Sequence, residues 1–373
     1  PPEARRIRTT VRLPQKGAGF RIEGEPALAA RIAGYEFSRE LSLDKGILTV
    51  DERIDATGTE IPASEVGTEK DRLATAKAQA PRLIAPANAL RQWDVAGRDP
   101  AGATQIAAAE AVYASAIAAD RDKAAPWRGR AAFRRAINDG KGALADLDKA
   151  IALEPDVDLY LMRAQLHQEQ GNLKAALADA DAARSLDPSS VQAVFTVANL
   201  RAETGDLPSA VDLLDQRISL GGDSRRTFQE GKADIIGRFG DPAEALALVE
   251  TLMEDRPGTP TLLNMRCWIK GTREVALETA TKDCTAALEV SNSPYAILDS
   301  RALVSYRLGR YDDALRDLNA VLNAVPGMAE SRFLRGVVLA RLDRADESKS
   351  DLAIARRIKP RIDTDYERYG IRP

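Results

Sequence analysis

Two cysteines and a single histidine are the residues of this sequence whose side chains are best suited to chemistry. Cys267 and Cys284 stand 17 positions apart (284 − 267), and His167 lies far upstream of both. A cysteine nucleophile needs a histidine beside it as a base, and a structural zinc site needs about four cysteine, histidine or acidic ligands. Since neither set is present, we expect no catalytic residue and no metal site.

The glycine-rich stretches also lack the pattern of a cofactor site. KGAGF, from Lys16, and LGGDS, from Leu220, read as turns, because neither has the spacing of a phosphate-binding or dinucleotide-binding loop. We therefore expect no cofactor and no enzymatic activity.

Composition narrows the classes of partner. The chain has 373 residues, of which 44% are hydrophobic and 29% are charged, as in ordinary folded proteins. The net charge is −3 and the charges are interspersed, so we expect no nucleic acid as a partner. No apolar run approaches the ~18 residues of a membrane span, so we expect no direct membrane insertion. The sequence starts at Pro1 without Met or a signal peptide, which predicts a mature form or a piece of a longer protein.

A repeat occupies most of the chain. Prolines close most of the units, at Pro155, Pro188, Pro257, Pro326 and Pro360. The first two and the last two are 33 or 34 residues apart, and the larger gaps are near multiples of that spacing. A glycine turn precedes most of these prolines by about seventeen residues, at Gly171, Gly205, Gly240 and Gly309. On either side of the turn, small or apolar residues recur at i, i+3, i+4 and i+7, which predicts two amphipathic helices per unit.

These units resemble the tetratricopeptide repeat (TPR) family, whose pattern has small residues at positions 8, 20 and 27 and proline at position 32. In the first full unit these positions hold Ala131, Ala143, Ala150 and Pro155. The same register runs through about seven helix hairpins, and the resemblance implies an α-solenoid wound as a right-handed superhelix. We expect the solenoid over residues 104–373, with a single helix before the first hairpin and a short helical cap or tail at DTDYERYGIRP.

The first part of the chain loses the helical period. RIRTTVRLP, GFRIEG, GYEFSRELSLD and GILTVDERIDA are rich in β-branched and aromatic residues and predict about four strands. The next stretch reads as a helix from Ser64 to a stop before Pro81. We expect a β-rich module over residues 1–80 and an extended linker over residues 81–103.

This module resembles the β-rich module that follows the core of bacterial transglutaminase-like proteins with TPR arrays. The residues that carry the resemblance are RTTVRLP, YEFSRELSLDKGILTVDERID, and EIPASEV leading to LIAP. The resemblance implies a missing N-terminal catalytic part and a periplasmic or cell-envelope location rather than a cytoplasmic one.

The TPR register also implies a binding groove, because the first helix of each hairpin lines the concave face of such arrays. A mixture of amide, charged and aromatic side chains suits an extended peptide. Trp268 and Tyr306 are the expected aromatic anchors. The full set of groove residues is Arg128, Arg135, Gln165, Phe195, Asn199, Asp234, Asn264, Trp268, Asp299, Tyr306 and Arg307.

The same register turns both cysteines into the interior of the fifth hairpin. Two readings stay open there: two buried free thiols acting as small hydrophobic residues, or a disulfide between Cys267 and Cys284. The stretch KGTREVA, from Lys270, carries one extra residue in the turn between them.

Three hypotheses for function follow. The leading one is a non-catalytic scaffold that binds a protein or peptide on the concave face. The second is a regulatory or substrate-presenting region of a larger transglutaminase-like or cysteine-protease-like envelope protein. The third is a module for oligomerisation through the outer face.

Overall fold

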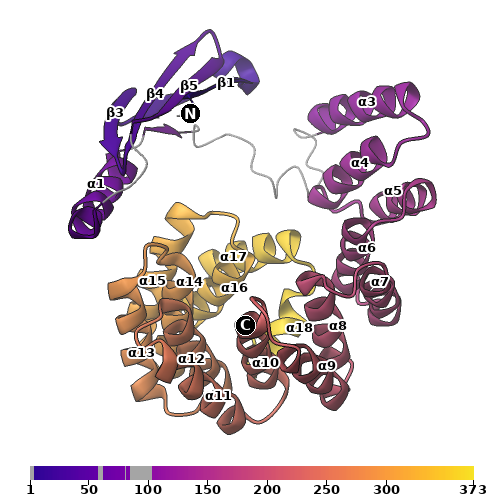
Figure 1. The fold of residues 1–373 in the computed structure, drawn as a ribbon, viewed down its shortest axis with the longest axis vertical. Helices are drawn as coiled ribbons and strands as arrows, with labels where there is room; N and C mark the ends of the chain where they lie inside the picture. Colours follow the sequence, from indigo (N-terminus) through magenta and orange to yellow (C-terminus); the bar gives the residue numbers. More distant parts are fainter. Residues whose placement is uncertain (1–3, 58–61, 80, 85–102) are drawn as a thin grey trace. The chain divides into compact units, whose positions relative to one another are not determined.

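The computed structural model describes residues 4–57, 62–79, 81–84 and 103–373 (Figure 1). The chain divides into two compact units, residues 1–90 and 91–373. The predicted β-rich module falls within the first unit and the predicted solenoid within the second. Most of the predicted linker, residues 85–102, lies outside the described residues.

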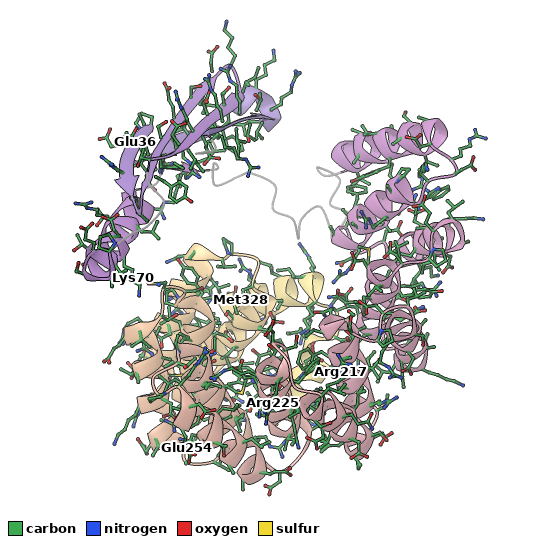
Figure 2. All side chains as sticks on the ribbon, viewed as in Figure 1. Glu36, Lys70, Arg217, Arg225, Glu254 and Met328 are labelled. Carbon is green, nitrogen blue, oxygen red and sulfur yellow. A yellow bond between two sulfur atoms is a disulfide. The ribbon has the colours of Figure 1, made fainter. Side chains whose placement is uncertain are left out.

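The N-terminal unit contains an antiparallel sheet of four strands. Its order is β1 (Ala4–Arg12), β5 (Ile47–Ala56), β4 (Tyr35–Asp44) and β3 (Ala27–Ile32). Lys45 and Gly46 form the turn between β4 and β5, both with positive φ. Figure 2 shows the side chains of this unit, with Glu36 labelled on β4 and Lys70 on the helix that follows the sheet.

Shorter elements complete the N-terminal unit. They are the 3-10 turns η1 (Pro14–Gly17) and η2 (Ala63–Glu65), the helix α1 (Val66–Gln79), and a two-stranded pair of β2 (Arg21–Glu23) with β6 (Arg82–Ile84). The sequence prediction of about four strands missed β3 and β6. The β3 sequence ALAARI is rich in alanine, so its strand form comes from pairing with β4 rather than from its own preference.

All secondary-structure elements described in the second unit are helices. The helix α3 (Ala103–Ala119) precedes seven hairpins, and α18 (Ile362–Glu367) follows them. The first helices of the hairpins are α4 (Ala124–Ala136), α6 (Val157–Glu169), α8 (Val191–Glu203), α10 (Arg225–Phe239), α12 (Pro260–Arg273), α14 (Tyr295–Arg307) and α16 (Ala329–Arg341). The second helices are α5 (Gly140–Leu153), α7 (Leu173–Leu186), α9 (Leu207–Ser219), α11 (Pro242–Asp255), α13 (Leu277–Val290), α15 (Tyr311–Ala324) and α17 (Ala345–Ile358).

The turn inside most hairpins depends on one residue in the left-handed region. Gly171, Gly205 and Gly309 have φ of 80°, 94° and 72° at this point, where a side chain would strain the backbone. Asn138 and Asp343 take the same place in the first and last hairpins, with φ of 57° and 58°, and these two residue types tolerate that conformation better than most.

Small residues let the two helices of each hairpin approach closely. Positions 8 and 20 of the repeat hold small residues that are almost completely buried, as shown by Ala131 and Ala143 at 1% and 0% exposure. In the last hairpin, a Cβ on Gly336 would stand 2.7 Å from Cγ of Leu352, so even alanine is too large there. Close packing of this kind is sensitive to a single added methylene group.

A buried ion pair joins the two helices in five of the seven hairpins. An arginine on the first helix binds an aspartate on the second, usually 16 residues later, as in Arg130–Asp146, with 2.6 Å between Nη2 and Oδ1. The third hairpin has Val197 and Leu213 at the same positions, both buried. The other pairs are Arg163–Asp179, Arg266–Asp283, Arg301–Asp317 and Arg335–Asp351.

None of the helices in the described ranges combines the length and the hydropathy of a membrane span.

Overpacking within one helix tests the role of the small residues. Ala355 is fully buried on α17, whereas Ala353, two positions earlier, is exposed. We expect Ala355→Leu to lower the free energy of unfolding by about 1–3 kcal/mol, because the added atoms have no space. Ala353→Leu, the matched control, should stay within about 0.5 kcal/mol of the wild type.

Urea denaturation followed by circular dichroism measures both effects. Equal stabilities for the two variants would show that the contact at position 27 does not limit the hairpin.

Candidate peptide-binding groove

The inner face of the first three hairpins holds an open hollow of about 830 Å³. It is bordered by α4, α6 and α8, the first helices that the repeat register placed on the concave face. Five predicted groove residues border this hollow, namely Arg128, Arg135, Gln165, Phe195 and Asn199.

Hydrogen bonds between polar side chains link these helices to one another. Arg135 donates from Nε and Nη2 to the two carboxylate oxygens of Glu169, at 3.1 and 2.5 Å. Gln168 donates from Nε2 to Oε2 of Glu203 at 2.5 Å. The first bridge joins α4 to α6 and the second joins α6 to α8, so both hold successive first helices in register.

The residues that border the hollow include an aromatic side chain, Phe195, and a side-chain amide, Asn199. Phe195 packs against Phe228 with 5.2 Å between ring centroids. A Cβ on Gly231 would lie 2.0 Å from Cε1 of Phe195, so glycine at that position leaves the space that the ring occupies. The Oδ1 atom of Asn199 is buried and has no hydrogen-bond partner among the described residues.

A deeper cavity of about 1050 Å³ continues from the hollow. Asp234 and Trp268 border it on one side. It is also bordered by residues that follow the last hairpin, including Arg361, Tyr366 and Tyr369. We call residues 359–371 the inner segment. In Figure 1, α18 lies inside the curve of the helical unit, near α8 and α10.

Comparison with known proteins agrees with this architecture. The family described as tetratricopeptide repeat matches residues 300–360, and the family described as ETO1 C-terminal domain matches residues 111–201. The helical unit is an array of tetratricopeptide repeats.

The similar proteins match this chain over different lengths. ETO1-like protein 2 of Arabidopsis thaliana is 30% identical over 90 residues, which is 24% of this chain and 10% of that protein. This chain therefore aligns with only about a tenth of the curated relative. Yeast Tom70 has a TM-score of 0.54 at 15% identity, over 84% of this chain and 76% of Tom70. A TPR protein from Parabacteroides merdae has a TM-score of 0.45 at 14% identity, over 66% of this chain and 98% of its own.

Three predicted groove residues of the later repeats contact other side chains or backbone atoms of the same chain. Trp268 meets the ring of Tyr369 edge-on, with 5.9 Å between centroids. Arg307 pairs with Glu274 at 2.7 Å and donates to the carbonyl oxygen of Tyr369. Tyr306 packs beside Tyr311, at 6.0 Å.

Two further residues of the predicted set have different surroundings. Asp234 borders the deeper cavity and pairs with Arg238 at 2.8 Å. The Oδ1 atom of Asn264, on α12, is buried without a hydrogen-bond partner among the described residues.

The structure corrects the expected position of Asp299. It was expected to line the groove, but it is only 5% exposed and accepts a hydrogen bond from Oγ of Ser331 on α16. The register places the residue on the inner side of α14, and there α16 of the next TPR covers it. Burial raises the pKa of the Asp299 carboxyl to about 6, while the Ser331 hydroxyl acts in the opposite direction.

His167 lies beside a carboxylate that already has a partner. The Nε2 atom of His167 lies 3.9 Å from Asp179, a carboxylate already bound by Arg163. The described part of the chain contains no group of three or more histidine, cysteine, aspartate or glutamate residues arranged to hold a metal ion.

The structure joins Cys267 and Cys284 in a disulfide between α12 and α13, with 5.5 Å between the Cα atoms. Both residues are fully buried, inside the fifth TPR hairpin. The turn between the helices contains Glu274 and Ala276, both in the left-handed region, where the sequence predicted an extra residue. Of the two readings that the sequence left open, the geometry fits the disulfide.

Sequence reasoning missed two residues that the inner segment contacts, Glu203 and Phe239. Glu203 is the thirteenth residue of the third TPR, counted from Val191, the position that the predicted groove residue Arg307 holds in the sixth TPR, counted from Tyr295. Phe239 is the last residue of α10, one place beyond the groove positions. The register therefore held a signal for Glu203 and none for Phe239.

The raised pKa of Asp299 predicts a pH-dependent stability. Because the folded state keeps the proton to a higher pH than the unfolded chain, whose aspartates titrate near 3.9, stability is lost as the pH rises from about 4 to about 7. We expect wild type to lose roughly 2–3 kcal/mol relative to Asp299→Asn over this range.

Urea denaturation at several pH values measures the difference. The exposed Asp312→Asn serves as the control and should follow the wild type. A stability difference between wild type and Asp299→Asn that stays constant with pH would contradict the assignment.

The disulfide makes a second prediction. Replacing both cysteines by alanine should lower the free energy of unfolding of the oxidised protein by about 3 kcal/mol, the value for closing a loop of this size in the unfolded chain. Reduced wild type is the matched control and should resemble the double variant. Intact mass after alkylation in denaturant, with and without reductant, decides the pairing: two alkylated thiols without reductant would rule the disulfide out.

Proposed function

We propose that this protein is a non-catalytic scaffold that binds an extended peptide segment of a partner protein on the concave face of its TPR array. The observation that carries the proposal is the open hollow between α4, α6 and α8. Repeat arrays of this kind build extended concave surfaces, and the match to the TPR family supports an interaction scaffold.

The side chains of the hollow suit the backbone of an extended peptide. Gln165 is exposed, and no described residue hydrogen-bonds to Oδ1 of Asn199. Amides both donate and accept hydrogen bonds, so they match the alternating N–H and C=O groups of a peptide strand. A ligand N–H at Asn199 would remove the cost of leaving a buried acceptor unpaired.

Two further side chains indicate what the peptide carries. Phe195 offers an apolar ring on the wall of the hollow, suited to an aliphatic or aromatic side chain of the ligand. Arg128 is exposed and has no ion-pair partner among the described residues. We therefore expect a ligand with an apolar residue over Phe195 and a carboxylate near Arg128.

Selection from a displayed random-peptide library on the full chain tests the proposal. Peptides that bind should lose about tenfold in affinity, equivalent to ~1.4 kcal/mol, with Arg128→Glu, because the ligand carboxylate then faces a like charge. Gln165→Ala should weaken them in the same direction. Both residues are exposed or at the groove surface, so neither change removes core packing.

Lys149→Glu on α5 is the matched control, since it makes the same charge change at an exposed site of a second helix. The proposal fails if no peptide is selected, or if the selected peptides bind Arg128→Glu and Lys149→Glu equally well.

A further inference from the structure

The inner segment is anchored to the last hairpin by buried side chains. Ile362, Tyr366 and Ile371 are 0%, 2% and 1% exposed. The ring of Tyr366 lies 4.7 Å from that of Phe333 on α16, and its hydroxyl donates to the carbonyl oxygen of Glu330 at 3.1 Å. This side of the segment covers the apolar end of the array, which would otherwise face water.

The other side of the inner segment reaches five earlier repeats, from the second to the sixth. Arg361 donates from Nη1 to the carbonyl oxygen of Gln168 on α6 at 2.7 Å. The guanidinium of Arg368 lies over the ring of Phe239, 4.7 Å from its centroid. Tyr369 meets Trp268 edge-on and accepts a hydrogen bond from Arg307. These contacts are those of a peptide bound in a groove, although the peptide is part of the same chain.

Glu203 is the residue on which these contacts converge. Its side chain is only 8% exposed, and Nη2 of Arg361 and of Arg368 each lie 3.7 Å from its Oε1 atom. Without the inner segment, Gln168 would be its one remaining hydrogen-bond partner among the described residues. A buried carboxylate is costly unless a cation pairs with it, so this pocket favours an arginine.

The neighbours of Glu203 strengthen the same preference. The face of Phe239 attracts a guanidinium through its ring electrons, and Trp268 presents an aromatic surface for a second ring. Asp234 and Glu330 also border the cavity, where Asp234 pairs with Arg238 and Glu330 with Lys359 of the inner segment. The buried carboxylate of Glu203 and the two aromatic rings therefore suit a peptide that carries basic and aromatic side chains.

We propose that Glu203, Phe239 and Trp268 form a second binding site, for a partner peptide that carries arginine and tyrosine side chains, and that the inner segment is its resident occupant. The side chains of Arg361 and Arg368 are 25% and 28% exposed, whereas Ile362 and Tyr366 are almost completely buried. The arginine contacts can therefore exchange while Ile362 and Tyr366 stay anchored. The deeper cavity continues from the open hollow, but Glu203, Phe239 and Trp268 do not border the hollow, so this site does not depend on the function proposed above.

A peptide with the resident sequence is the probe. RIDTDYERYGIRP, residues 361–373, is acetylated, amidated and labelled for fluorescence anisotropy. The full chain with Arg361→Ala, Arg368→Ala and Tyr369→Ala vacates the site and retains the buried anchors. We expect this triple variant to bind the probe at least about tenfold more tightly than wild type, because the probe restores contacts that wild type already makes within the chain.

Three controls make the result specific. Adding Glu203→Gln to the triple variant should abolish the gain, and a probe with alanine in place of Arg361, Arg368 and Tyr369 should not bind. Arg128→Glu should leave the probe's affinity unchanged, which separates this site from the open hollow. Equal affinity of wild type and triple variant, or a gain that survives Glu203→Gln, would overturn the proposal.

Hydrogen exchange on the wild-type chain gives an independent answer if the triple variant does not fold. The amide of Ile371 donates to the carbonyl oxygen of Tyr366 in the resident segment. Excess probe should speed exchange of the chain's own residues 367–371, since the displaced segment loses this bond, and the alanine probe should not. Unchanged exchange with excess probe would also overturn the proposal.

Discussion

Close contact between small residues inside each hairpin is the constraint on which the helical unit depends. Alanine, glycine or cysteine at position 8 of each repeat lets the two helices of a hairpin approach closely. Each hairpin then presents its first helix on the same side of the array as its neighbour does. The hairpins stack as near copies because the contact recurs with nearly the same spacing. The concave face is thus a consequence of local packing that is repeated along the chain.

Buried arginine–aspartate pairs add specificity to this packing. A pair of this kind contributes little net stability, because both charges lose their hydration, but breaking it leaves one charge buried alone. Shifting α5 along α4 would separate Arg130 from Asp146 and leave the aspartate, at 1% exposure, without its partner. The pairs therefore penalise wrong registers between the two helices more than they strengthen the right one.

The sequence predicted the local structure well and the long-range contacts poorly. Proline, glycine and alanine spacing placed the helices and turns, since each signal acts within one hairpin. Asp299 was misplaced, because its burial depends on Ser331 in the next repeat. The contacts of Arg368 and Tyr369 were not foreseen, since they depend on curvature accumulated over several repeats. In the N-terminal unit, β3 was missed because its alanines favour a helix until β4 pairs with them.

The central claim is that the inner segment occupies the concave face of its own array. The most direct test places a photo-crosslinking phenylalanine derivative at position 369 of the full chain and identifies the products by mass spectrometry. The structure predicts links within one chain to the peptides that contain Trp268 on α12 and Arg307 on α14, two residues of earlier repeats that contact Tyr369. Links confined to α16 and α17, or links only between separate chains, would contradict the account.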